Sequence, residues 1–99
     1  MTDYRNKSVD NLFKVISEIG TEKECYAFFE DLCTIKEIQD MAQRLETAIL
    51  LDKGENYQNI SAKVGVSSAT ISRVNRCLNY GSGGYKAAIG KINAKGQIK

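Results

Sequence analysis

The fold is decided by one stretch, YQNISAKVGVSSATISRVNRCL (residues 57–78). Ile60 and Val64 lie one turn apart on a first short helix, and the second helix repeats its apolar residues at the spacing i, i+3 and i+7: Ile71, Val74 and Leu78. Gly65 falls where the first helix must end with a positive φ, which costs glycine little. Ser67 can then act as the N-cap of the second helix. The spacing predicts a helix-turn-helix.

The outer face of the second helix carries short polar side chains and guanidinium groups: Ser68, Ala69, Ser72, Arg73 and Arg76. Groups of these kinds can contact base edges and phosphates in a DNA major groove. Any small helical domain also needs a helix, a glycine turn and a second helix, so spacing alone gives false positives. Here the glycine, the capping serine and the apolar spacing agree, and the stretch therefore predicts DNA binding.

Charge is divided unevenly along the chain. Residues 1–54 carry 7 Lys/Arg against 11 Asp/Glu, a net charge of −4, whereas residues 55–99 carry 7 Lys/Arg against one acid, Glu55, a net charge of +6. A basic half that contains the helix-turn-helix, joined to an acidic half, is the layout expected of a DNA-binding dimer. The alternative is that these charged side chains are simply solvent-exposed and are divided unevenly between the two halves by chance.

Length and composition favour an all-α fold of about six helices in a single domain, residues 1–99, with flexible tails at 1–7 and about 94–99. The chain has no proline and little strand patterning. Before the helix-turn-helix we expect three helices, and after it a last amphipathic segment. Ser8 is expected to cap the first helix, which runs to about Ile19. Capping-box spacings place the starts of the next two helices after Thr21 and Thr34.

The second and third of these helices carry most of the apolar residues outside the helix-turn-helix. The second is apolar on more than one face, so we expect it to pack on its own subunit and on a partner's. The third runs from Ile35 to about Lys53 and is closed by Gly54. Its expected core stripe is a set of six residues: Ile35, Ile38, Met41, Leu45, Ala48 and Ile49.

Several classes of function are disfavoured. The chain has no histidine, the commonest general base, and no carboxylate pair or metal-ligand spacing, so we expect neither an enzyme nor a metal site. Its three cysteines, Cys25, Cys33 and Cys77, have no CxxC spacing and are expected to be reduced core residues of a cytoplasmic protein. No stretch approaches the ~20 apolar residues of a membrane span. The glycines at 81–84 lack the lysine of a phosphate loop.

Two segments resemble the Trp repressor family, and most closely its short YerC/YecD-type members. They are ECYAFFEDLCTIKEIQDMAQRLETA (24–48) and GVSSATISRVNRCLNYG (65–81). The resemblance implies an intertwined, all-α homodimer that binds palindromic operator DNA with one helix-turn-helix per subunit. It implies base contacts from Ser68, Ala69 and Ser72, with Gln58 and Asn59 near the DNA backbone. Ser67 and Thr70 complete the predicted DNA-binding set.

The resemblance also implies a position for an effector pocket. The Trp repressor holds tryptophan between two arginines with a threonine nearby, and these positions fall on Arg44, Arg73 and Thr34. Val74, however, stands where the repressor has glycine, and Cys77 stands where it has serine. Because a branched side chain at 74 would intrude on the space of an indole ring, we expect that tryptophan is not the ligand and that no cofactor is needed.

Two interpretations of that pocket and two of the function remain open. Protein side chains or another ligand can fill the pocket, or the arginines can be ion-paired, for instance with Glu37 or Glu46. The leading function is a sequence-specific DNA-binding transcription regulator, a repressor, that acts as a homodimer. The alternative is a helical, dimeric protein-interaction module without DNA-binding activity, because the second helix carries only two arginines, Arg73 and Arg76.

Overall fold

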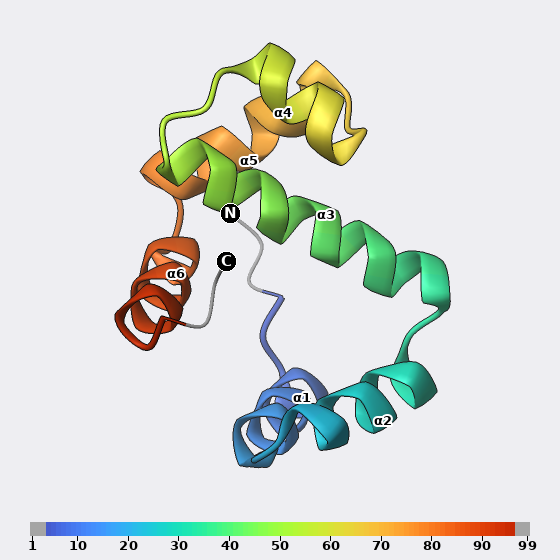
Figure 1. Ribbon diagram of the computed structural model, residues 1–99. Helices are drawn as coiled ribbons and strands as arrows, with labels where there is room; N and C mark the ends of the chain where they lie inside the picture. Colours follow the sequence, from blue (N-terminus) through green and yellow to red (C-terminus); the bar gives the residue numbers. More distant parts are fainter. Residues whose placement is uncertain (1–3, 97–99) are drawn as a thin grey trace. The chain divides into compact units, whose positions relative to one another are not determined.

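The computed structural model describes residues 4–96, and within that range the chain forms six α-helices and no β-strand (Figure 1). The helices are α1 (Lys7–Glu18), α2 (Glu22–Leu32), α3 (Ile35–Asp52), α4 (Tyr57–Val64), α5 (Ser68–Tyr80) and α6 (Gly84–Ala94). The all-α prediction is confirmed. Residues 1–3 and 97–99, which belong to the predicted flexible tails, lie outside the described range.

The chain divides into two compact units, residues 1–38 and 39–99. The organisation as one domain over residues 1–99 stays a prediction. None of the helices within residues 4–96 is both long and apolar enough to span a bilayer.

In the first unit, side-chain caps fix where the helices begin. Asn6, not the expected Ser8, caps α1, because its Oδ1 accepts a hydrogen bond from the backbone N–H of Val9 at 2.9 Å. The prediction of Ser8 as the cap is wrong, and Lys7 is already helical. At α2 the prediction is confirmed: the Glu24 N–H donates to Thr21 Oγ1 at 3.1 Å.

Neither α1 nor α2 contains a buried residue. Phe28 and Phe29 meet edge to face, with ring centroids 5.5 Å apart, yet both remain partly exposed. Phe13 is 56% exposed and Tyr26 is 64% exposed. The apolar stripes of this unit are therefore not closed into a core by the single chain.

The second unit contains the core. One cluster joins Ala48 of α3, Val74 of α5 and Ile89 of α6, and another joins Ile60 of α4 with Val66 and Ile71. Leu51, near the end of α3, packs against both clusters. Burying an isoleucine fully is worth about 1.5–3 kcal/mol, so these contacts hold α4, α5 and α6 against the end of α3.

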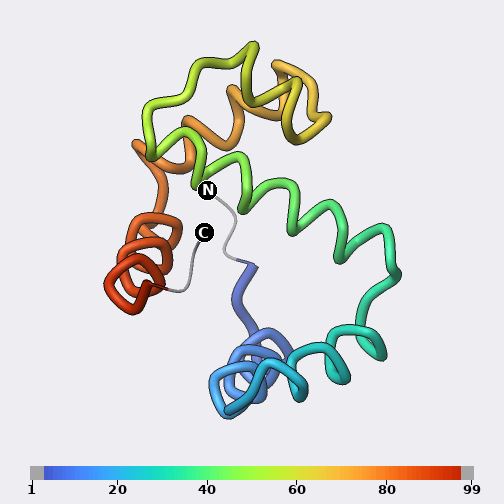
Figure 2. Tube along the Cα trace, viewed as in Figure 1, coloured from blue at the N-terminus to red at the C-terminus, as the bar shows by residue number. Residues whose placement is uncertain are grey.

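The end of α3 is set by Gly54, as predicted. Gly54 has φ +89°, its N–H donates to the Leu51 carbonyl, and the Glu55 N–H donates to the Leu50 carbonyl, each at 3.0 Å. This pair of bonds is a Schellman motif, which terminates a helix and turns the chain. The chain then enters α4 and reverses through a tight connection into α5 (Figure 2).

The expected core stripe of α3 is only partly correct. Ala48 is buried, but Ile35 is 75% exposed and Leu45 is 43% exposed. Thr47 is the other fully buried residue of α3, and its hydroxyl donates to the Gln43 carbonyl at 2.8 Å. That bond satisfies the hydroxyl locally, which is why a polar residue can be buried there.

The cysteine prediction is wrong in one respect. Cys25, Cys33 and Cys77 are free thiols, but Cys25 and Cys77 are exposed and Cys33 is only half-buried. Cys77 lies between Val74 and Leu78 in sequence but on another face of α5, so its apolar neighbours in the chain do not cover it.

Candidate nucleic-acid interface

The helix-turn-helix is built from α4 and α5, and local hydrogen bonds fix its turn. Gly65 takes the left-handed conformation with φ +82°, and its N–H donates to the Ser61 carbonyl at 2.9 Å. The Ser61 hydroxyl donates to the Val66 carbonyl at 2.9 Å. Ser67 accepts from the Thr70 N–H at 3.2 Å. The predicted roles of Gly65 and Ser67 are confirmed.

Beneath the turn lies a fully buried apolar contact. Ile60 and Ile71 are both 0% exposed, and Val66 between them is 9% exposed. The two helices are therefore held against each other by side chains that leave their polar faces outside. An element that must present side chains to DNA in a fixed geometry needs a rigid base of this kind.

The outer face of α5 is exposed as the sequence predicts. Its exposed side chains are Ser68, Ala69, Ser72, Arg73 and Arg76, and Ser67 at the N-cap is also exposed. Thr70 differs, because it is half-buried and its hydroxyl lies 3.2 Å from the Ser67 hydroxyl. Gln58 and Asn59 are exposed near the start of α4. Exposure of this face is shown, and its contact with DNA stays a prediction.

An open hollow of about 470 Å³ lies along this face and brings together residues of α4 and α5: Tyr57, Gln58, Ser61, Ala62 and Ser68. Gln58 and Ser68, both predicted DNA contacts, thus share one depression. Tyr57 was not predicted, although it is 37% exposed at the first position of α4. Its place at a helix start beside two predicted contacts is the signal that identifies it.

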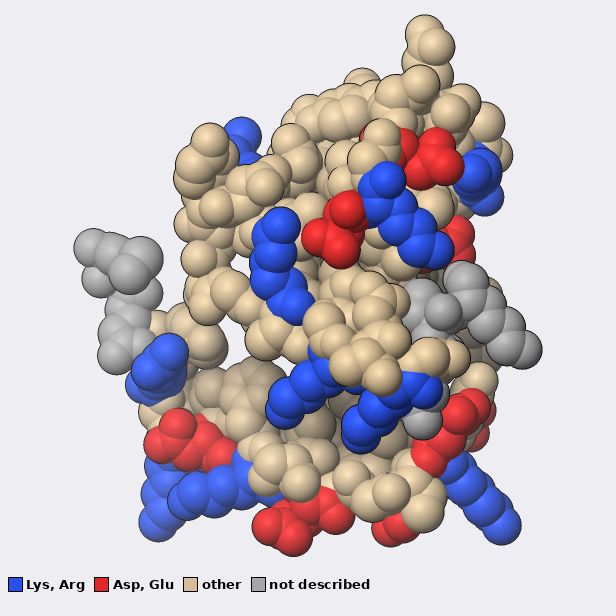
Figure 3. Space-filling model, turned by 60° about the vertical axis from the view of Figure 1, so that its left-hand side comes forward, with Lys and Arg blue, Asp and Glu red and all other residues tan. Residues whose placement is uncertain are grey.

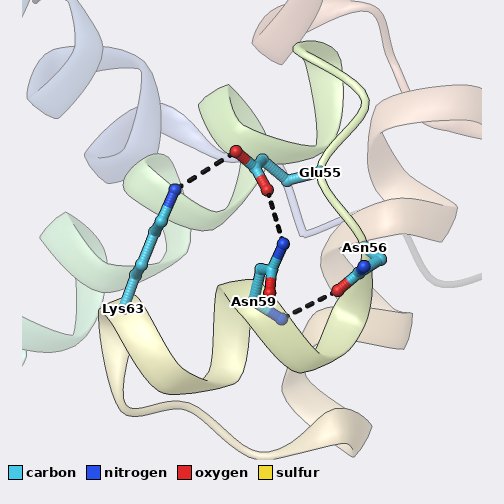
Figure 4. A network of polar contacts seen from close by, with 4 residues as sticks. All are labelled: Glu55, Asn56, Asn59 and Lys63. Carbon is cyan, nitrogen blue, oxygen red and sulfur yellow. Dashed lines mark hydrogen bonds and ion pairs between the residues drawn. The ribbon is translucent and has the colours of Figure 1, made fainter.

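The start of α4 carries a polar network drawn in Figure 4. Asn56 caps the helix, its Oδ1 accepting from the Asn59 N–H at 2.8 Å. The Asn59 Nδ2 donates to Glu55 Oε2 at 3.2 Å, and Lys63 Nζ donates to Glu55 Oε1 at 3.1 Å. The hydrogen bond from Asn59, followed by that from Lys63 and its charge, lowers the pKa of the Glu55 carboxyl.

A second cavity, of about 250 Å³, lies between α3 and α5 and contains three of the four residues predicted for the effector pocket. Arg44, Arg73 and Val74 line it, together with Asp40, Gln43, Val66 and Thr70. Small-molecule sites usually begin at roughly 300 Å³. The fourth residue, Thr34, is instead the cap of α3: its Oγ1 accepts from the Glu37 N–H at 3.1 Å, and its own N–H donates to Glu37 Oε1 at 2.8 Å.

Val74 lines this cavity and also belongs to the core. It is only 2% exposed and packs with Ala48 and Ile89, so its side chain is fixed in the core as well as lining the space. Within residues 4–96, neither Arg44 nor Arg73 forms an ion pair, so the alternative of pairing with Glu37 or Glu46 is not seen.

Two of the lysines that give residues 55–99 their positive charge form ion pairs with acidic side chains. Lys63 pairs with Glu55 at 3.1 Å, and Lys86 pairs with Asp52 of α3 at 3.6 Å. On the face drawn in Figure 3, basic and acidic side chains are interspersed, and no unbroken basic field is seen there. Arg73 and Arg76 are the exposed basic side chains of α5, and Lys91 and Lys95 are exposed near the end of α6.

Comparison with known proteins gives consistent results. The family model described as Trp repressor protein matches residues 7–93. The uncharacterized protein YerC of Bacillus subtilis (strain 168) is 51% identical over 88 residues, which cover 89% of this chain and 85% of YerC.

Solved structures agree with this. The crystal structure of a candidate Trp repressor from Staphylococcus aureus matches with a TM-score of 0.86 and 42% identity, over 90% of this chain and 89% of that one. The crystal structure of a TrpR like protein from Eubacterium eligens ATCC 27750 matches with a TM-score of 0.85 and 42% identity, over 96% and 95% of the two chains.

Proposed function

This chain belongs to the Trp repressor family, and we propose that it is a transcription regulator, a repressor, that binds a two-fold symmetric DNA site as a homodimer. The family is one of regulators rather than enzymes. The observation that carries the proposal is the exposed polar face of α5 above the buried contact of Ile60 with Ile71. Such a protein would act in the cytoplasm, where bacterial DNA lies.

In this proposal the two helices of the motif have different parts. Ser68, Ala69 and Ser72 of α5 contact base edges and thymine methyl groups, while Arg73 and Arg76 contact phosphates. Gln58 and Asn59 of α4 lie near the DNA backbone, and Ser67 and Thr70 set the start of the recognition helix. A dimer would place its two copies of α5 about 34 Å apart, one turn of the duplex.

The exposed apolar residues of α1 and α2 support the homodimer. These helices contain no buried residue, although they carry Phe13, Phe28 and Phe29. A chain of about 100 residues buries only some two-thirds of its unfolded surface alone, so a second subunit that covers such residues adds much to its stability. We propose that both subunits contribute these helices to a shared core.

We further propose that tryptophan is not the effector. Val74 is buried and fixed against Ala48 and Ile89, and its branched side chain reduces the space between Arg44 and Arg73. An indole ring would have to displace a packed core residue. The regulator then binds its operator without tryptophan.

The experiment is the selection of duplexes from a random pool, followed by binding isotherms at several salt concentrations. A palindromic consensus and an affinity that falls with salt are expected. Replacing Arg73 and Arg76 together by alanine should weaken binding and reduce the log–log salt slope by about 1.8, since each lost phosphate contact accounts for about 0.9.

The matched control removes the same charge elsewhere: Lys7 and Lys14 of α1, both exposed, are replaced together by alanine. This variant should keep the wild-type slope. An affinity independent of salt, or an arginine variant that binds like the wild type, would refute DNA binding through α5.

The second candidate, a protein-interaction module, is favoured by one observation. Lys63 of α4 is already paired with Glu55, which leaves the motif few charges for phosphates. If no duplex is enriched in the selection while the protein remains a stable dimer, this function replaces the first.

A further inference from the structure

One acidic side chain lies within the basic half of the chain, in the connection that leads into the helix-turn-helix. Glu55 is the single acidic residue of positions 55–99. Glu55 lies in the connection before α4, and its carboxylate faces Asn59 and Lys63, which are one helical turn apart on α4 (Figure 4). Asn59 is also one of the residues predicted to lie beside the DNA backbone.

Glu55 forms hydrogen bonds with the side chains of both Asn59 and Lys63. Its two carboxylate oxygens accept from Asn59 Nδ2 at 3.2 Å and from Lys63 Nζ at 3.1 Å. The Asn59 backbone N–H donates to Asn56 Oδ1 at 2.8 Å. The side chain of Glu55 is 29% exposed and that of Lys63 is 55% exposed, so both groups are accessible to solvent.

A DNA phosphate would need the same donors. Phosphate contacts in protein–DNA complexes come from Lys and Asn side chains and from N–H groups at helix starts. Here a carboxylate already accepts from the two side-chain donors, and it would also repel an incoming phosphate. Like other glutamates, Glu55 is ionised at neutral pH, and its hydrogen bonds from Asn59 and Lys63 lower its pKa.

We propose that Glu55 limits the DNA affinity of this helix-turn-helix by holding Asn59 and Lys63 away from phosphate contacts. The inference rests on the proposed function and names a positioning residue within it. Because α4 then makes fewer contacts with the DNA phosphates, a larger share of the binding energy comes from α5. In the proposed function α5 is the helix that contacts the base edges. Glu55 thereby lowers binding to DNA of any sequence.

The test is Glu55→Gln in the full chain, because glutamine keeps the size of the side chain and an oxygen that accepts from Asn59 but loses the charge. Binding is measured on a selected duplex and on a scrambled duplex of equal length, over a series of salt concentrations. The affinity for both duplexes should rise by about two- to fivefold at about 0.1 M salt, the range of an exposed charge pair.

The rise should be similar on the two duplexes because phosphate contacts carry no sequence information. The log–log salt slope should become steeper by about 0.9, the value for one added phosphate contact. A merely structural role of Glu55 would not change that slope.

Asp52→Asn is the matched control. It also removes one negative charge and releases one lysine, Lys86, but that lysine lies on α6 and not on the helix-turn-helix. The slope should stay within error of the wild type. Lys63→Ala should change little in the wild-type background and should remove the gain in the Glu55→Gln background.

Five outcomes of these experiments distinguish the inference from its alternatives. Tighter binding with a steeper slope in Glu55→Gln, cancelled by Lys63→Ala, supports the inference. An unchanged slope, weaker binding at equal unfolding free energy, or an equal gain in Asp52→Asn overturns it while the proposed function stands. A wild-type protein whose binding to all duplexes is independent of salt overturns the proposed function instead.

Discussion

Replacing Val74 by glycine tests whether this side chain closes the cavity of α3 and α5 to tryptophan. Val74 is 2% exposed, packs with Ala48 and Ile89, and lines the cavity of about 250 Å³ beside Arg44 and Arg73. Glycine at this position removes the branched group and enlarges the cavity between the two guanidinium groups. The variant should therefore gain a response to tryptophan that the wild type lacks.

The expected cost in stability follows from the side chain that is lost. Three buried carbon atoms at about 0.8 kcal/mol each, and about 1 kcal/mol for glycine within a helix, give a loss of roughly 3 kcal/mol. Small proteins have about 5–15 kcal/mol of stability, so the variant should remain folded. A ligand present at a hundred times its Kd adds about 2.7 kcal/mol, which would restore most of the loss.

The assay is urea unfolding of the wild type and of Val74→Gly, each with and without L-tryptophan. Leu78→Ala is the control, because Leu78 is buried on the same helix but does not line the cavity. Leu78→Ala should lose about 2–5 kcal/mol and show no response to tryptophan. The reasoning is refuted if tryptophan stabilises the wild type, or if folded Val74→Gly gains nothing from it.

Two further predictions concern the turns beside the helix-turn-helix. Gly81→Ala should lower the unfolding free energy by about 1–3 kcal/mol, because the new Cβ would lie 2.3 Å from the Cys77 carbonyl oxygen, whereas Gly84→Ala meets open space and should cost little; thermal unfolding compares them. Glu55 has a lowered pKa, so its contribution to stability is present above the ordinary glutamate pKa of about 4.3 and is lost as the pH falls through the lower folded value. Unfolding midpoints should therefore drop more steeply with acid in the wild type than in Glu55→Gln, and parallel curves would count against this assignment.

Features set by neighbouring residues could be predicted from the sequence. The structure contains the helix end at Gly65, the N-cap at Ser67 and the capping boxes that begin α2 and α3. Each of these features depends on side chains and backbone groups that lie within a few residues of each other. The exposed face of α5 follows in the same way from the apolar spacing. That spacing leaves one face for the core and the other for solvent.

Other features depend on choices that local patterns leave open. Asn6 and Ser8 are both good caps, and an apolar stripe fixes the face of α1 but not the residue at which it begins. Burial of Thr47 depends on how α3 packs and on the bond of its hydroxyl to Gln43, neither of which a hydropathy pattern contains. Glu55 lies in a connection and Lys63 in a helix, so helical spacing does not predict their ion pair. This pair neutralises one of the lysines that the sequence counts as basic charge.

The difference between the two units bears on how the proposed regulator would respond to its own concentration. Residues 39–99 contain every buried residue within the described range, whereas α1 and α2 contain none. If a second copy covers the apolar side chains of α1 and α2, ordering of those helices is coupled to association. The unfolding midpoint then rises with protein concentration. The operator needs two recognition helices at a fixed separation, so DNA binding would report the same coupling. An exposed aromatic such as Phe13 would thus affect repression without touching DNA.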